Sequence, residues 1–296
     1  MSKHPLLVTD SQQLARALES LQGDSGSLGL VPTMGALHDG HLSLVQRSLQ
    51  QCPTTAVTIF VNPAQFNDSQ DLDKYPRDID RDLRLLGEAG VDLVYAPTQE
   101  DIYPDGFSDW VEPPEAAEKW EGEQRPGHFR GVCTVIHRLL HFVPADVLFL
   151  GEKDYQQAVV IKQTVRQHGL STQLEICPTV REHDGLAMSS RNTYLSPAER
   201  QQATGLWKCL QQGQAMVLEG ETRSQVITEE LSRVLETEGF GQVDYLAIVD
   251  PETLQPREQI DIPLRLLIAA RLGTTRLIDN CLLTLPAGPA AAADQE

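Results

Sequence analysis

The chain has 296 residues, and its 42 acidic and 24 basic side chains give a formal net charge of -18. This acidic balance argues against a nucleic-acid-binding protein, which needs a basic surface to meet phosphate. Hydrophobic residues make up 41% of the chain and charged residues 22%, which excludes collagen-like, coiled-coil and wholly disordered proteins. We expect one large α/β domain with a smaller second domain.

Neither a membrane segment nor a disulfide framework is indicated. The sequence has no run of about 18 apolar residues, and residues 1–9 lack the basic and apolar blocks of a signal peptide. We therefore expect a cytoplasmic protein with no membrane partner. The five cysteines are widely spaced and never form C-x-x-C, so neither disulfides nor a structural zinc site is expected.

Short β-rich segments alternate with amphipathic helices up to about residue 179, as in βαβ units with a parallel sheet. Strands are predicted at residues 28–31, 56–61, 92–95, 147–150 and 173–177. Leucine and valine recur between them at helical spacing. We expect residues 1–179 to form a doubly wound, Rossmann-like domain whose ligands bind beyond the carboxyl ends of the strands.

The pattern changes after residue 196. Two long helices are predicted at residues 197–218 and 223–238, followed by short antiparallel strands at 243–249, 264–269 and 276–278. Residues 180–283 are therefore expected to form a smaller α+β domain that acts as a lid. The Ala-, Gly- and Pro-rich residues 284–296 are expected to be a disordered tail.

The segment PTMGALHDGH, residues 32–41, follows the first predicted strand and opens a helix. Its glycines let the backbone approach an anion, and the free N–H groups of a helix start favour phosphate. His38 and His41 can point to one place, donate to phosphate oxygens and carry positive charge as negative charge develops. The alternatives are a Gly-rich turn or a zinc pair, although H-E-x-x-H is absent.

The second segment, and after it a separate acidic turn, follow the second predicted strand. In FVNPAQF, residues 60–66, the amide of Gln65 can read a small polar acid, but Asn-Pro is also an ordinary turn signal. In YPRDIDRD, residues 75–82, Asp80 and Asp82 fall in a predicted first helical turn. They either complement the helix dipole or face a magnesium ion.

The segment RPGHFRG, residues 125–131, places cationic residues and His128 before another helix. It is also explained as a capped helix start. His137 and His141 lie four residues apart on that helix, but the sequence shows no third ligand, so metal binding there is not expected.

The last two segments lie at the fourth strand and at the expected domain junction. In GEKDYQQ, residues 151–157, a strand end, a glycine, a lysine and a helix start suit a polyphosphate, although the charges also form an ordinary surface cluster. In VREHDGLAMSSRN, residues 180–192, two serines, an arginine and an asparagine in succession suit a triphosphate. Helix capping explains the nearby Ser196 but not this run.

Together the five segments resemble the pantothenate synthetase (pantoate–β-alanine ligase) family of the nucleotidyltransferase superfamily. The H-x-G-H pattern alone is weak, and the order and spacing of all five segments carry the resemblance. It runs from PTMG at residues 32–35 to RLGTTRLIDN at residues 271–280. No Walker motif and no G-x-G-x-x-G occur, so an ordinary kinase, ATPase or dinucleotide-binding protein is not supported.

The resemblance implies a homodimer that uses ATP and magnesium to join (R)-pantoate to β-alanine through a pantoyl adenylate, releasing AMP and pyrophosphate. It makes His41 the proton donor, with His38, Lys153 and Arg191 as further catalytic groups. Gln65 and Gln157 match the positions that bind pantoate or β-alanine. The implied ATP-binding residues are Met34, Gly35, Ala36, Leu37, His38, Asp39, Gly40, His41, Gly151, Glu152, Lys153, Asp154, Val180, Met188, Ser189, Ser190 and Arg191.

Three further features concern the metal, the pantoate pocket and the amine step. Asp82 is the candidate magnesium ligand. Ala64 stands where many family members carry methionine, which changes one wall of the implied pantoate pocket. The sequence names no base for the amine of β-alanine.

Two other functions compete with the ligase. An adenylyltransferase would leave AMP on its product, whereas the ligase releases free AMP. An ATP-sensing module would bind nucleotide without turnover.

Overall fold

The computed structural model describes residues 4–22, 26–67 and 69–286. The chain divides into two compact units. The first consists of Met1–Arg181 and Met188–Ser190, and the second of Glu182–Ala187 and Arg191–Glu296. Most of the tail predicted at residues 284–296 lies outside the described residues. Within the described part of the chain, no helix is long and apolar enough to cross a membrane.

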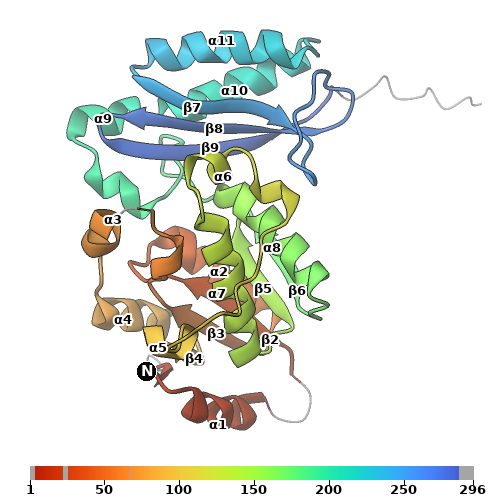
Figure 1. The fold of residues 1–296 in the computed structure, drawn as a ribbon. Helices are drawn as coiled ribbons and strands as arrows, with labels where there is room; N and C mark the ends of the chain where they lie inside the picture. Colours follow the sequence, from red (N-terminus) through yellow and green to blue (C-terminus); the bar gives the residue numbers. More distant parts are fainter. Residues whose placement is uncertain (1–3, 23–25, 68, 287–296) are drawn as a thin grey trace, which may run out of the picture. The chain divides into compact units, whose positions relative to one another are not determined.

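The first unit is built on a six-stranded parallel sheet in the order β1-β4-β3-β2-β5-β6 (Figure 1). The strands are β1 (Leu6–Val8), β2 (Leu28–Thr33), β3 (Thr54–Ile59), β4 (Leu93–Tyr95), β5 (Val147–Gly151) and β6 (Gln173–Cys177). The predicted doubly wound sheet is confirmed. Strand β1 was not predicted, because it has only three residues, two of them exposed, and pairs with β4 alone.

The order in which the chain adds strands to the sheet reverses at the centre of the sheet. From β2 the chain runs through β3 to β4, whereas β5 and β6 continue on the other side of β2. Right-handed crossovers then place the helices between β2 and β4 on one face and the helix between β5 and β6 on the other. The carboxyl ends of β2 and β5 therefore form the switch point at which ligands of doubly wound folds bind.

The helices of this unit form two layers. On one face α2 and α4 pack with the sheet around a core that includes Val45, Leu86 and Phe149, all 0% exposed. In the other layer α8 contacts β5, and α7 contacts both α1 and α8. The longer helices are α1 (Ser11–Gln22), α2 (Asp39–Gln51), α4 (Ile79–Ala89), α7 (His128–Phe142) and α8 (Tyr155–Gln167). The shorter ones are η2 (Pro63–Gln65), α3 (Ser69–Lys74), α5 (Gln99–Ile102), η3 (Glu115–Ala117), α6 (Glu121–Gln124) and η4 (Glu152–Asp154).

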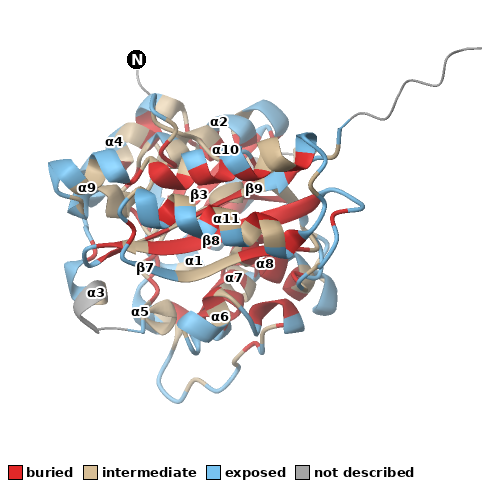
Figure 2. Cartoon of the chain, turned by 90° about the horizontal axis from the view of Figure 1, so that it is seen from above, coloured by how far each residue is buried: buried red, intermediate tan, exposed pale blue. Residues whose placement is uncertain are grey.

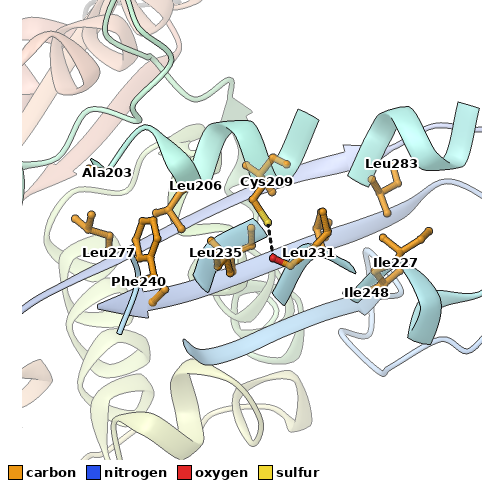
Figure 3. Packing of buried hydrophobic residues seen from close by; sticks show 14 of the residues in the cluster. Ala203, Leu206, Cys209, Ile227, Leu231, Leu235, Phe240, Ile248, Leu277 and Leu283 are labelled. Carbon is orange, nitrogen blue, oxygen red and sulfur yellow. Dashed lines mark hydrogen bonds between the residues drawn. The ribbon is translucent and has the colours of Figure 1, made fainter. Parts of the chain in front are cut away.

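The second unit packs helices on a three-stranded antiparallel sheet in the order β7-β8-β9. Its elements are η5 (Ser190–Tyr194), whose first residue belongs to the first unit, α9 (Pro197–Gln202), α10 (Gly205–Leu218), α11 (Ser224–Thr237), β7 (Gln242–Val249), β8 (Leu264–Leu272) and β9 (Thr275–Leu283). Figure 2 shows the buried residues in red, and on β8 all but one of the residues are buried. Leu206, Leu231 and Leu235 of α10 and α11 meet the sheet in one apolar core (Figure 3).

Two predictions for this unit are wrong in detail. The helix predicted at residues 197–218 is two helices. Its break falls at Thr204, whose hydroxyl donates to the carbonyl oxygen of Gln201 at 2.8 Å and competes with helical bonding. The strand predicted at residues 276–278 continues to Leu283. Asp279 and Asn280 interrupt its apolar pattern, yet both are buried, and Arg265 donates to Asn280 Oδ1 at 3.0 Å.

Candidate active site

The loop after β2 turns sharply through two left-handed residues, Gly35 (φ 78°) and Ala36 (φ 52°). The N–H of Gly35 donates to Thr33 Oγ1 at 3.2 Å. The N–H groups of Ala36 and Leu37 donate to the two carboxylate oxygens of Asp82, at 2.9 and 3.0 Å. Asp82 on α4 is 1% exposed and therefore fills the anion-binding concavity that such a turn creates.

This arrangement changes two expectations from the sequence. The N–H groups of Gly35, Ala36 and Leu37 are engaged within the protein, so they are not free for phosphate as the glycines suggested. Both oxygens of Asp82 accept backbone hydrogen bonds, and Arg81 Nη1 lies 3.6 Å from one of them. The geometry gives Asp82 the role of a loop anchor and lends no support to a magnesium ligand there.

Hydrogen bonds within the loop and a contact between the two rings fix His38 and His41 at the start of α2. His38 Nδ1 accepts from the N–H of Gly40 at 3.1 Å, and His41 Nδ1 accepts from the N–H of His38 at 3.4 Å. Their ring centroids are 4.1 Å apart. Because each Nδ1 acts as an acceptor, the proton of each neutral ring sits on Nε2. The pair therefore presents two Nε2–H donors.

Burial keeps both rings neutral. Burial first and His38 second lower the pKa of His41 to about 3. Burial and then the charge of Lys153 lower the pKa of His38. Without a bound anion the pair therefore consists of neutral donors rather than the cations expected from the sequence.

The end of β5 supplies the positive charge. Gly151 closes β5, and Lys153 and Asp154 follow in η4. The charges of Lys153 and Asp154 shift the pKa of both His38 and His41, so the GEKD segment is within electrostatic range of the pair. Lys153 Nζ is 3.6 Å from Asp154 Oδ1, and its side chain is 18% exposed. The switch point thus combines two neutral donors with a largely buried ammonium group.

Gln65 lies in η2, which follows β3, and its side chain contacts the loop after β2. Its Nε2 donates to Met34 Sδ at 2.9 Å, which connects η2 to the loop after β2. The backbone carbonyl oxygen of Gln65 accepts from His128 Nδ1 at 2.9 Å and from Arg125 Nη2 at 3.2 Å. Since a carbonyl only accepts, His128 carries its proton on Nδ1, and Nε2 accepts from Arg125 Nη1 at 3.2 Å.

His128 is a structural group in this arrangement. It is 5% exposed, and burial followed by the charge of Arg125 lowers its pKa to about 4. The sequence identified the segment at residues 125–131 but not its partner, because the contact spans about 60 residues of chain. The cationic Arg125 and the neutral His128 of this segment fix the backbone at Gln65.

The two neighbouring glutamines at the start of α8 have different environments. Gln156 is 4% exposed and uses its amide to bond the carbonyl oxygens of Ala116 and Lys119, both at 2.8 Å, and the N–H of Glu121 at 2.9 Å. Gln157 is half-buried, and its amide makes no hydrogen bond to the described residues. Of the two neighbouring amides, that of Gln157 is the one available to a ligand.

The segment at residues 180–192 is shared between the units. The N–H of Met188 donates to the carbonyl oxygen of Val180 at 3.0 Å, and Met188 lies beside Gly40 of α2. Ser189 and Ser190 belong to the first unit. Arg191 belongs to the second, where Asn192 donates to Glu182 Oε1 at 3.2 Å and to the carbonyl oxygen of Ala187 at 3.1 Å.

The first unit therefore brings together Met34, His38, His41, Gln65, Lys153, Asp154 and Met188, from separate segments of the chain. Asp39 is exposed in the first turn of α2. Sequence reasoning missed Asn62 and Gln156 as buried supports, because Asn-Pro and Gln-Gln carry no signal for burial. Within the described residues, no three His, Cys, Asp or Glu side chains are arranged to hold a metal ion.

Comparison with known proteins agrees with this geometry. The family profile described as pantoate-beta-alanine ligase matches residues 6–282. The chain belongs to the pantoate–β-alanine ligase family. The pantothenate synthetase of Dehalococcoides mccartyi (strain CBDB1) is 47% identical over 258 residues, which cover 87% of this chain and 96% of that relative. That of Rubrobacter xylanophilus is 47% identical over 270 residues, covering 88% and 93%.

Solved structures of this ligase family match the fold. Pantothenate synthetase from Thermus thermophilus gives a TM-score of 0.88 at 41% identity, over 94% of this chain and 99% of that one. Pantoate–β-alanine ligase from Francisella tularensis, complexed with beta-gamma ATP and beta-alanine, gives 0.79 at 35% identity, over 94% and 97%.

Proposed function

We propose that the switch point of the first unit is where this ligase activates pantoate with ATP. The overall reaction of the family joins pantoate to β-alanine and converts ATP to AMP and pyrophosphate. The observation that carries the proposal is the meeting of His38, His41 and Lys153 beyond β2 and β5. Two oriented donors and one ammonium group suit the phosphates of ATP.

In the first step a carboxylate oxygen of pantoate attacks the α-phosphorus of ATP, and the bond from that phosphorus to pyrophosphate breaks. The carboxylate is ionised at neutral pH, so this step needs alignment and charge neutralisation rather than a base. The Nε2–H groups of His38 and His41 donate to phosphate oxygens. Because Nδ1 of His41 accepts from the N–H of His38, His41 acts as a neutral Nε2–H donor that hydrogen-bonds the leaving pyrophosphate as negative charge develops on it.

Gln65 and Gln157 are proposed to bind pantoate. Neutral amides suit the hydroxyls and carboxylate of a small hydroxy acid, whereas Lys153 and the histidines suit phosphate. In the second step the amine of β-alanine attacks the acyl carbon, and the bond from that carbon to the AMP oxygen breaks. Pantothenate and AMP then leave, and the amine must have lost a proton beforehand.

Magnesium is proposed to accompany ATP. This ion prefers substrate phosphates and water, with only one or two protein carboxylates. That preference fits a site whose described residues form no three-ligand cluster. When bound, the ion would neutralise phosphate charge, and the roles given above to His41, Lys153 and Gln65 do not depend on it.

We also propose that the second unit acts as a lid that keeps water from the adenylate, with Arg191 as a cation for ATP. Acyl adenylates are prone to hydrolysis, and lids commonly exclude water in such reactions. The enzyme is proposed to work in the cytoplasm as a homodimer, and light scattering of the purified protein tests the dimer directly.

The function is tested by incubating the protein with ATP, magnesium, pantoate and β-alanine, followed by mass spectrometry. Pantothenate, free AMP and pyrophosphate in equal amounts are the expected products. A product that retains AMP would instead show an adenylyltransferase, and ATP binding without turnover would show a sensing module. Omitting pantoate serves as the control and should abolish AMP formation.

A further inference from the structure

Asn62, just after β3, is a buried amide whose hydrogen-bonding capacity is fully used. It is 1% exposed. Its Nδ2 donates to Gln65 Oε1 and to the carbonyl oxygen of Gly131, both at 3.1 Å. Its Oδ1 accepts from the N–H of Ala64 at 3.2 Å and from the hydroxyl of Tyr103 at 2.8 Å. Two donors and two acceptor positions are all that an amide offers.

These four bonds allow only one orientation of the Asn62 amide. If the amide were flipped, its oxygen would face the carbonyl oxygen of Gly131 and its NH2 group would face the N–H of Ala64, so two buried bonds to the backbone would be lost. The two donors that hold the oxygen in place are the Ala64 N–H and the Tyr103 hydroxyl. The hydroxyl is the only side-chain group among them.

The orientation of Asn62 is passed on to Gln65. Because the Asn62 NH2 group faces Gln65 Oε1, the Gln65 amide turns its oxygen to Asn62 and its nitrogen to Met34 Sδ. One Nε2–H and one lone pair of Oε1 remain for a ligand. Their directions are therefore set by Asn62.

Tyr103 is anchored independently of its hydroxyl. Its ring stacks on Trp110 with centroids 5.5 Å apart and meets the edge of Phe107 at 5.2 Å. Burial raises the pKa of Tyr103, so the hydroxyl keeps its proton and donates. Removing the oxygen alone should leave the aromatic packing in place.

We infer that Tyr103 is a positioning residue for the acid substrate: its hydroxyl helps to hold the Asn62 side chain in place, and Asn62 orients the amide of Gln65. This inference rests on the proposed function, in which Gln65 binds pantoate. In this role Tyr103 acts through Asn62 and Gln65. It determines which atoms Gln65 presents to a hydroxyl or carboxylate of the hydroxy acid.

The test uses Tyr103→Phe with Tyr95→Phe as the matched control. Tyr95 of β4 is 0% exposed, and its hydroxyl has no hydrogen-bond partner among the described residues. Tyr103→Phe should lower kcat/KM for pantoate about 5- to 10-fold, the usual effect of one hydrogen bond. The Kd for ATP should not change, and Tyr95→Phe should leave both quantities as in the wild type.

A double-mutant cycle separates positioning from a general structural effect. In a Gln65→Ala background, Tyr103→Phe should cause less than about a twofold further loss, because the hydroxyl acts through Gln65. An equal loss in both backgrounds, or an equal loss of ATP affinity, would overturn the inference. If the wild type is active and Tyr103→Phe has the same kcat/KM for pantoate as Tyr95→Phe, the inference is refuted and the proposed function stands. If the wild type makes no pantothenate, the proposed function is refuted.

Discussion

The core of the second unit and the carboxyl edge of the first unit's sheet are stabilised in different ways. The core of the second unit is a continuous apolar layer, in which Leu206, Leu231 and Leu235 are at most 2% exposed. At the carboxyl edge of the first unit's sheet, the buried supports are polar. Asn62 and Asp82 are each 1% exposed, and each holds a segment that carries a site residue.

This contrast indicates where stability and activity are coupled. A leucine in the second unit contributes through packing, which is not directional. A buried amide or carboxylate in the first unit contributes through directed bonds, so its loss both destabilises the fold and misplaces a neighbour. We therefore expect changes at the edge of the sheet to affect catalysis, and changes in the core of the second unit to affect stability alone.

The largest expected effect is on catalysis without a matching loss of stability. His41→Ala should slow adenylate formation about 10²- to 10³-fold, because it removes a preorganised donor at the leaving group. Rapid quench of a single turnover measures this rate. His168→Ala, an exposed histidine at the end of α8, is the control and should react normally. Near-normal adenylation by His41→Ala would contradict its assigned role.

The reverse effect is expected in the second unit. Leu231→Ala should lower the free energy of unfolding by about 2–5 kcal/mol, because it leaves a cavity among residues that cannot fully collapse. Urea unfolding measures this loss, and Leu218→Ala, at a residue 52% exposed, should cost less than about 0.5 kcal/mol. Activity per folded molecule should be unchanged. A loss of kcat at full folding would remove the distinction between the units.

Acid should destabilise the first unit before the second. The pKa values of His41 and His128 are lowered to about 3 and about 4, so below about pH 6.5 the unfolded chain binds protons that the native state does not. Stability therefore falls as pH falls from 6.5 toward 4, and His128 alone accounts for about 2 kcal/mol at pH 5.

Hydrogen exchange at several pH values measures the protection of backbone amides in each unit separately. The second unit has one histidine, His183, which is exposed, so its protection should change less between pH 7 and 5. His128→Asn should flatten the acid limb of the first unit. Equal loss of protection in both units would contradict this explanation.

A smaller effect is expected at Asp82. Asp82→Asn keeps the shape but places an NH2 group against a backbone N–H, which should cost about 1–3 kcal/mol of stability and also lower activity. Asp80→Asn, exposed in the same turn, is the control. If Asp82→Asn weakened only the response to magnesium and left stability intact, the loop-anchor role would be wrong and the metal role restored.

The sequence predicted the fold where the signal was local. The pattern of apolar residues located five of the six strands, and polar or glycine-containing segments after β2, β3 and β5 pointed to the carboxyl edge. It could not predict that Asp82 bonds residues 46 positions earlier or that Tyr103 bonds an amide 41 positions away. Such contacts depend on how crossover helices pack, which single-residue patterns do not encode. Resemblance singled out Gln157, but only tertiary contacts show that Gln156 is a structural support.

The central claim, activation of pantoate as an adenylate at this site, is tested most directly with pantoate labelled with ¹⁸O in its carboxylate. When the amine of β-alanine displaces AMP, one carboxylate oxygen stays on the phosphate. Mass spectrometry should therefore find the label in AMP at one atom per pantothenate formed. Label in phosphate or pyrophosphate, with none in AMP, would contradict the adenylate mechanism.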